Sequence, residues 1–263
     1  MLTQYLTFVS RRQHWRLYRG AGTKQLLAEK AGAEPVVDAA AAVRPFLWLA
    51  CAGSGRQGLV RRLRLPQLTA ETIPWAGGRI GAVASAPDGE RAVVLELPDT
   101  VEAEPQLRLW TSTAWQPIET RERPDISSAL AWIGRDAVAY ESATRCLAVI
   151  GLSSGQIELG PPGSSPAAAV QRREWHAVTA GKVLTFAVER PFDAAPRVLE
   201  GFSFGTPFRI RFTNDGEICT WMEPFLVKQV KGYVQQRGGR RRRLRELSDG
   251  FAIVVGPVEG MAA

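Results

Sequence analysis

The feature that most constrains this chain is a recurring pattern of one short apolar strand, a tight turn and a second apolar strand. Turn-forming residues separate such strands at five places, most of them about 45 residues apart: 43–45, 88–89, 134–135, 180–181 and 215–216. A polar gap and a further strand follow each pair. A period of this length, with several short strands per repeat, is typical of a ring of four-stranded sheets, the β-propeller.

Tryptophan spacing and the scarcity of helical periodicity favour the same interpretation. Trp132, Trp175 and Trp221 lie 43 and 46 residues apart, close to those turns. The one helix-like segment, residues 24–33, directly follows two strand-like runs, and we interpret it as a third strand. The pattern therefore predicts an all-β chain.

Five internal turns and a partial blade at the N-terminus predict six blades, with five or seven as the alternatives. The chain starts with YLTFVS, which resembles the second strand of a blade, and FAIVVGPV occupies residues 251–258 near its other end. We expect FAIVVGPV to supply the missing first strand, so that the C-terminal strand closes the ring. Residues 1–263 are expected to form a single domain, because all-β domains of this length commonly stay undivided.

One segment resembles a known repeat. SAPDGERAVVL, residues 85–95, is similar to the repeat of the TolB and WD40-like propellers, in which a strand ends in a Pro-Asp-Gly turn and an apolar strand follows. FTNDGEICTW, residues 212–221, is a looser copy. Asp-Gly supplies the positive φ angles that a two-residue hairpin turn requires. The resemblance implies a propeller; the peptidases that carry such a propeller also carry an α/β-hydrolase domain, which we do not expect within these residues.

Signals for catalysis are weak. No HExxH, CxxC or Walker pattern is present, and the two histidines, His14 and His176, fit a surface turn and a packed strand better than a catalytic base. Four acids are candidates for a calcium site in a central channel, but most lie in or beside the turns, where a structural role is preferred: Asp38, Asp88, Asp136 and Asp215. We expect no catalytic residue, metal or cofactor, and a channel-sited hydrolase, lactonase or lyase is kept as an alternative.

Basic residues concentrate in one segment. The net charge is +7, and residues 224–245 alone carry eight basic residues and no acid, so the rest of the chain is close to neutral. Alternating apolar residues predict a strand there, and RGG ahead of four arginines predicts a projecting loop. Arginine forks bind carboxylate or phosphate bidentately, and a nearby tyrosine can stack on a ligand. A solvated charge run on a strand connection is the competing explanation.

These observations predict a non-catalytic protein-interaction module that presents a rigid propeller surface and an arginine-rich loop to an acidic protein. The expected binding residues are Lys228, Lys231, Tyr233, Arg237, Arg240, Arg241, Arg242, Arg243 and Arg245. The alternative partner is nucleic acid, for which counterion release makes affinity fall steeply with salt.

Two expectations concern the environment of the chain. Its apolar runs are far shorter than the ~20 residues of a transmembrane helix, and its N-terminus lacks the pattern of a secretory signal, so a cytoplasmic protein is expected. Cys51, Cys146 and Cys219 are widely spaced within apolar runs, which favours buried free thiols.

Overall fold

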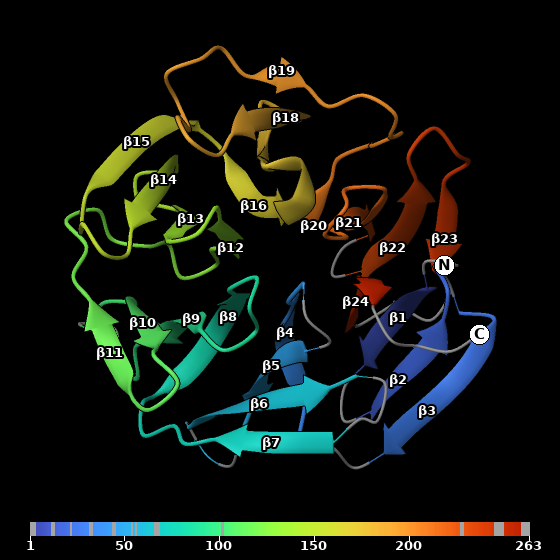
Figure 1. Ribbon diagram of the computed structural model, residues 1–263, viewed down its shortest axis with the longest axis horizontal. Coiled ribbons are helices and arrows are strands. Elements are labelled where there is room, and N and C mark those ends of the chain that lie inside the picture. The colour runs from blue at the N-terminus through green and yellow to red at the C-terminus, as the bar shows by residue number, and fades with distance from the viewer. Residues whose placement is uncertain are drawn as a thin grey trace.

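The chain forms a ring of four-stranded antiparallel sheets (Figure 1). The computed structural model describes residues 4–11, 14–21, 23–31, 34–43, 46–53, 55, 57–65, 69–100, 103–226, 229–244 and 250–258. Within these residues there are six sheets, and the innermost strand of each contacts the innermost strands of its neighbours around the ring. The predicted all-β, six-bladed propeller is therefore confirmed.

The first half of the ring contains three blades, whose strands are given from the centre outward. The closing blade contains β24 (Gly250–Val258), β1 (Gln4–Arg11), β2 (His14–Arg19) and β3 (Gln25–Ala31). The second blade contains β4 (Val36–Ala41), β5 (Phe46–Ala52), β6 (Gly58–Arg64) and β7 (Thr69–Ile73). The third blade contains β8 (Arg79–Ser85), β9 (Ala92–Leu97), β10 (Gln106–Trp110) and β11 (Trp115–Ile118).

The second half of the ring repeats this order. The fourth blade contains β12 (Leu130–Ile133), β13 (Ala137–Glu141), β14 (Cys146–Gly151) and β15 (Ile157–Pro162). The fifth blade contains β16 (Ser164–Ala169), β17 (Glu174–Thr179), β18 (Lys182–Ala187) and β19 (Arg197–Val198), with the 3-10 helix η1 (Val170–Arg172) between its first two strands. The sixth blade contains β20 (Phe208–Phe212), β21 (Ile218–Leu226), β22 (Gln229–Gln236) and β23 (Arg242–Leu244).

The closing blade joins the two ends of the chain as expected. β24 pairs antiparallel with β1, and Ile253 stands opposite Phe8 in this pairing. Residues 24–33 supply β3 of the same blade, which confirms that this segment is a strand and not a helix. Main-chain hydrogen bonds between the ends of the chain thus close the ring, which leaves no innermost strand without a neighbour on either side.

The predicted turn phase holds at four of the five predicted turns. Turns 88–89, 134–135 and 215–216 each connect an innermost strand to the second strand, and 43–45 falls between β4 and β5, although residues 44 and 45 lie outside the described part. Turn 180–181 instead connects β17 to β18, the second and third strands. The corresponding turn of the fifth blade is η1, and it contains no Asp-Gly: Arg173 takes the left-handed conformation after it, with φ 54°. The phase assigned to this blade was therefore wrong.

Tryptophans mark the second strands. Trp48, Trp175 and Trp221 lie on β5, β17 and β21 and are fully buried. Trp132 lies on an innermost strand, so its spacing from the other two does not mark an equivalent position. Clusters of buried apolar side chains also lie between neighbouring blades. One of them contains Phe8, Leu47 and Ile253 and joins the closing and second blades. Burial of each such side chain contributes about 1.5–3 kcal/mol, which makes the ring rigid.

The cysteines agree with expectation in two cases of three. Cys51 and Cys219 are free and buried, and burial raises the pKa of the Cys51 thiol to about 12. Cys146 is free but only partly buried. Among the described residues, no helix has the length and apolar character needed to cross a membrane.

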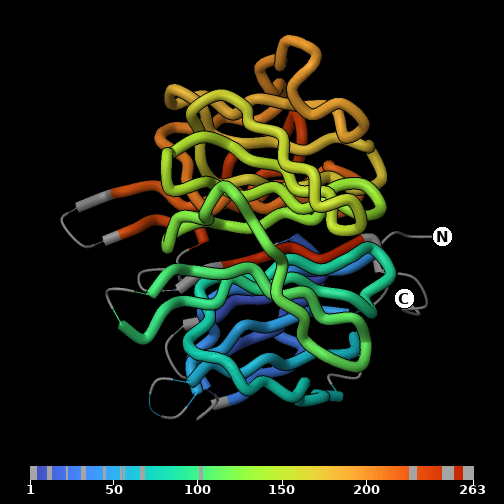
Figure 2. The backbone as a smooth tube through the Cα atoms, turned by 90° about the vertical axis from the view of Figure 1, so that its left-hand side faces the viewer, coloured from blue at the N-terminus to red at the C-terminus, as the bar shows by residue number. Residues whose placement is uncertain are grey.

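The two faces of the disc differ. We call the face where the innermost strands begin the entry face, and the opposite one, which carries the 88–89 and 215–216 turns, the turn face. β21 and β22 are 9 and 8 residues long, and Figure 2 shows this pair, in orange to red, extending beyond the disc on the side away from the marked chain ends. Because β21 ends on the entry face, this hairpin stands on that face.

Candidate functional site

The predicted binding residues lie on the two outer strands of the sixth blade. Lys231 and Tyr233 are on β22, and Arg242 and Arg243 are on β23. The turn between these strands contains Arg237, Arg240 and Arg241. The predicted arginine loop is thus a β-hairpin, with its tight turn on the turn face. Lys228 and Arg245 lie outside the described residues.

Strand alternation distributes these cations over both sides of the blade. Arg242 stands opposite the buried Val234, and Arg243 stands opposite Tyr233. Neighbouring residues of a strand point to opposite faces of the sheet, so Arg242 faces the closing blade while Arg243 faces the fifth. Side chains 240–243 are all exposed. We call the set Lys231, Arg240, Arg241, Arg242 and Arg243 the basic edge.

The basic edge is ordered largely by contacts that leave its charge in place. Arg242 donates from Nη2 to the carbonyl oxygen of Ala21 at 2.8 Å, and Arg241 donates from Nη1 to the carbonyl oxygen of Ser203 at 3.2 Å. Arg241 also pairs with Glu223 at 3.0 Å. Arg240 makes no hydrogen bond or ion pair with any described residue. Desolvation, and then the charge of Arg243, lower the pKa of Lys231, while the charge of Glu223 raises it.

Arg237 and Tyr233 face inward. The Arg237 guanidinium lies 5.1 Å from the centroid of the Phe202 ring and donates to the carbonyl oxygens of Glu200 at 3.0 Å and Gly216 at 3.3 Å. Burial, and then the charge of Arg172, lower its pKa. The Tyr233 ring stacks on Trp221 at 5.6 Å between centroids, and the Arg241 guanidinium lies 4.4 Å from the Tyr233 centroid. Both predicted residues therefore make contacts that hold the hairpin itself.

A second polar site lies at the mouth of the central channel on the entry face; the sequence interpretation named only Asp38 of its residues, as a candidate channel acid. A cavity of about 380 Å³ opens there between the beginnings of the innermost strands. We call it the channel mouth, and its charged and hydroxyl side chains are Asp38, Ser127, Ser128, Glu141, Arg145, Ser164, Ser165, Arg209 and Arg211.

Backbone irregularities shape the channel mouth. Four innermost strands change register near their first residues, at 36/38, 80/82, 164/167 and 208/211. Ser165 and Arg209 have φ angles of 53° and 49°, in the left-handed region that non-glycine residues seldom adopt, and the Arg209 N–H donates to Ser165 Oγ at 3.1 Å. β-Bulges redirect side chains at sheet ends, and here they turn polar groups toward the axis of the ring.

Two of the three arginines at the channel mouth are paired with carboxylates. Arg211 Nη2 pairs with Asp38 Oδ1 at 2.8 Å, and these side chains are only 14% and 11% exposed. Asp38 also accepts the Val83 N–H at 3.0 Å. Arg145 pairs with Glu141 at 2.9 Å and lies 3.6 Å from Asp125. Arg209 alone makes no side-chain hydrogen bond or ion pair with the described residues.

The other acids and the histidine considered for a metal or catalytic site make hydrogen bonds within the protein. Asp88 accepts the Glu90 N–H at 2.8 Å, Asp136 accepts the Ser153 N–H at 2.8 Å, and Asp215 accepts the Tyr5 hydroxyl at 2.5 Å. In the described part of the chain no three metal-ligating side chains come together. His176 is buried, its Nδ1 lies 3.1 Å from Thr185 Oγ1, and burial lowers its pKa to about 3.

Residues 201–205, GFSFG, match the GxSxG pattern of a hydrolase nucleophile. That motif requires a sharp turn from a strand into a helix. Here the segment connects β19 to β20, both strands, and Ser203 donates its N–H to Gln235 Oε1 at 2.8 Å. The pattern therefore does not form a nucleophile elbow.

Comparison with solved structures defines the class of this fold. TolB from Acinetobacter baumannii is similar, with a TM-score of 0.69 and 11% identity, over 95% of this chain and 66% of that chain. A protein described as putative TolB from Agrobacterium tumefaciens is similar with a TM-score of 0.63 and 12% identity, over 95% of this chain and 97% of that chain. No family model matches, and no curated protein matches. The chain has the TolB-like six-bladed propeller fold.

Proposed function

We propose that this chain is a non-catalytic protein-interaction module whose basic edge binds an acidic segment of a partner protein. The observation that carries the proposal is that Arg242 is exposed and donates to the Ala21 carbonyl oxygen, while Arg240 beside it makes no hydrogen bond or ion pair with a described residue; Arg241 is paired with Glu223. A carbonyl oxygen fixes the direction of a guanidinium without neutralising it. The fork remains available to a carboxylate, which it binds bidentately.

A protein partner is favoured over nucleic acid by the extent of the basic surface. Binding to a phosphate backbone draws on many separate cation–phosphate contacts along a strip of surface. The excess positive charge here is confined to residues 224–245, and the rest of the chain is close to neutral. An edge of one blade matches a short acidic segment better than it matches a long duplex or strand.

The test is a pull-down from the native host after nuclease treatment. Wild-type protein is expected to retain one partner in stoichiometric amount, and the Arg240→Gln/Arg243→Gln variant is expected to lose most of it. A variant with Arg135→Gln and Arg190→Gln, exposed arginines of other blades, is the matched control and should bind as wild type does. Loss of all bound material on nuclease treatment would establish the nucleic-acid alternative, and equal capture by both variants would refute the basic edge as the site.

The proposal includes the cytoplasmic setting expected from the sequence. The free thiols of Cys51, Cys146 and Cys219 fit a reducing compartment, where cysteines stay unpaired. Recovery of the native protein from a periplasmic or secreted fraction would contradict this part alone and would leave the basic edge to be judged by the pull-down.

A further inference from the structure

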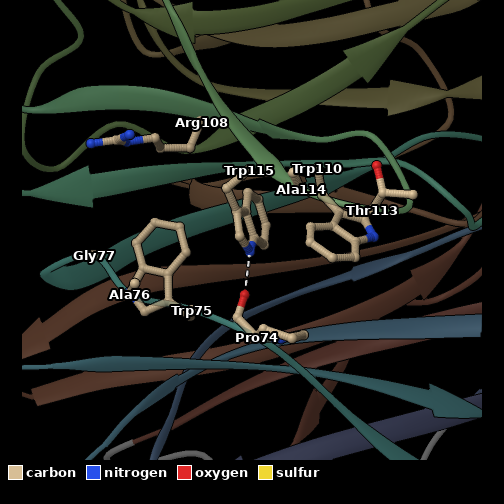
Figure 3. Close-up of a pocket in the computed structure, with 9 residues that line it drawn as sticks. All are labelled: Pro74, Trp75, Ala76, Gly77, Arg108, Trp110, Thr113, Ala114 and Trp115. Carbon is tan, nitrogen blue, oxygen red and sulfur yellow. Dashed lines mark hydrogen bonds between the residues drawn. The ribbon is translucent and has the colours of Figure 1, made fainter.

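A pocket lined by three tryptophans opens at the rim of the ring, between the second and third blades. Its volume is about 450 Å³, and it lies between residues 74–77, which follow β7, and the β10–β11 hairpin. In Figure 3, Trp115 stands between Trp75 and Trp110, and Arg108 lies on the Trp75 side. We call this the indole pocket. Its volume falls within the range of small-molecule sites, roughly 300–1,000 Å³.

The indole rings form a fixed corner. The Trp75 and Trp115 centroids are 5.0 Å apart with planes at 88°, and Trp110 and Trp115 are 5.4 Å apart with planes at 48°. Trp115 Nε1 donates to the Pro74 carbonyl oxygen at 2.7 Å, and Trp75 Nε1 donates to the Gly78 carbonyl oxygen at 2.9 Å. These bonds hold both rings in place and use their donors. Trp75 and Trp115, which are only partly buried, therefore offer ring faces to a ligand.

Polar groups lie at the edge of this corner. Arg108 Nε donates to Glu96 Oε2 at 2.7 Å, while the Gly78 N–H donates to Glu96 Oε1 at 2.7 Å. The two terminal amino groups of Arg108 make no hydrogen bond with any described residue. The exposed Thr113 lines the opposite part of the pocket. The edge thus offers unused donors and a hydroxyl, with the charge of Arg108 compensated by Glu96.

We propose that the indole pocket binds the pyranose ring of a saccharide. A pyranose with equatorial hydroxyl groups presents a face of C–H groups, which pack on the electron-rich face of an indole, and a rim of hydroxyls, which bind an arginine fork. Arg108 in the lining disfavours a cationic ligand, and Glu96 beside it disfavours a phosphate. This ligand class goes beyond the protein partner proposed for the basic edge, and the two sites lie on different blades.

The experiment follows the indole N–H signals by ¹⁵N NMR during titration with cellobiose, a disaccharide whose non-reducing ring carries only equatorial substituents. The Trp75, Trp110 and Trp115 signals are expected to shift saturably, with a dissociation constant on the order of 1 mM. Trp132 and Trp175, buried in other blades, should not move. Wild-type protein is used throughout as the reference.

Three variants leave the packed tryptophans intact. Ala114→Tyr fills the pocket from an exposed position and should abolish the shifts, whereas Ala143→Tyr, at an exposed alanine of the fourth blade, should preserve them. Arg108→Gln removes the fork and should weaken binding about tenfold, which corresponds to about 1.4 kcal/mol. Shifts that survive Ala114→Tyr, or no saturable shift at about 50 mM cellobiose, would overturn the proposal. Pull-down results for the basic edge are unaffected by either outcome.

Discussion

Two groups of arginines in this propeller differ in how they are held. At the channel mouth, Arg211 is paired with Asp38 and Arg145 with Glu141, so carboxylates compensate the cations. At the basic edge, Arg242 donates to a backbone carbonyl oxygen, and Arg241 donates to another and also pairs with Glu223. Ion pairs with carboxylates therefore hold the arginines of the first group, whereas backbone carbonyl oxygens orient those of the second.

This difference separates stability from binding. A buried cation whose carboxylate is removed loses its compensation and destabilises the fold strongly, whereas an exposed cation contributes little to stability. The same exposed cation contributes to the electrostatic attraction of a partner. We therefore expect substitution of the mostly buried Asp38–Arg211 pair to change unfolding and substitutions at the basic edge to change binding.

The largest expected effect follows from Asp38→Ala. This change leaves the Arg211 guanidinium buried without its carboxylate and removes the acceptor of the Val83 N–H. The free energy of unfolding, measured by urea denaturation, is expected to fall by about 3 kcal/mol. The Asp38→Ala/Arg211→Met double variant should recover part of this loss, because the uncompensated charge is gone. Equal stability of wild type and Asp38→Ala would show that the pair is not structural.

Acid should weaken the fold through His176. Burial, and then the charges of Arg237 and Arg172, lower the pKa of His176 to about 3, whereas an unfolded histidine titrates near 6.5. The unfolded state therefore binds more protons between these values, so stability is complete above about pH 6.5 and falls as the pH drops, by up to about 1.4 kcal/mol per pH unit. A His176→Leu variant should lack this part of the slope, and His14→Gln should retain it. Identical slopes in wild type and His176→Leu would refute the assignment.

Arg237 lies in the turn between β22 and β23, beside the basic edge, but its side chain faces inward. It therefore tests whether burial, and not position in this hairpin, decides which arginines stabilise the fold. Arg237→Met removes its hydrogen bonds to the Glu200 and Gly216 carbonyl oxygens. A hydrogen bond to a charged group contributes about 1.5–3 kcal/mol to stability. Because Arg237 is only partly buried, we expect the free energy of unfolding to fall by about 1.5 kcal/mol. Thermal unfolding measures it. A melting temperature like that of the wild type would place Arg237 with the exposed arginines.

The smallest effect on stability is expected for substitution of the exposed Arg240 and Arg243. Arg240→Gln/Arg243→Gln should change the free energy of unfolding by less than about 0.5 kcal/mol, because exposed charges contribute little. The same urea titration checks it beside Asp38→Ala. A loss as large as that of Asp38→Ala would erase the distinction between the two groups.

Much of the fold is predictable from local residues. The Asp-Gly turn at 88–89 and the apolar strand after it define one blade by backbone conformation alone, and the strand pattern at both chain ends indicates the closure between β1 and β24. The first turn of the fifth blade was assigned to the wrong residues. It is formed by η1 with Arg173 in the left-handed conformation, which an arginine in the sequence does not predict. Ala180 and Gly181 do carry the usual signal, but they join the next pair of strands.

Of the two polar sites, the basic edge can be predicted from the sequence and most of the channel mouth cannot. The basic edge is a run of arginines within one hairpin, so composition alone locates it. The channel mouth depends on ring closure: Asp38 and Arg211 are 173 residues apart and meet only when the second and sixth blades surround one axis. Ser165 and Arg209 take left-handed φ angles at register shifts of β16 and β20, a conformation that their residue types do not signal.

The central claim is that the clustered, exposed cations make the basic edge the binding surface, and Arg240 and Arg209, an exposed arginine of the channel mouth, form a matched pair to test it. Both are exposed, and neither guanidinium has a hydrogen bond or ion pair within the described residues. Calorimetric titration with a hexaglutamate peptide at several salt concentrations measures each variant. We expect Arg240→Gln to weaken binding several-fold and to flatten its salt dependence, and Arg209→Gln to bind as wild type does. Loss of binding in Arg209→Gln with wild-type binding in Arg240→Gln would contradict the account and place the acidic ligand at the channel mouth.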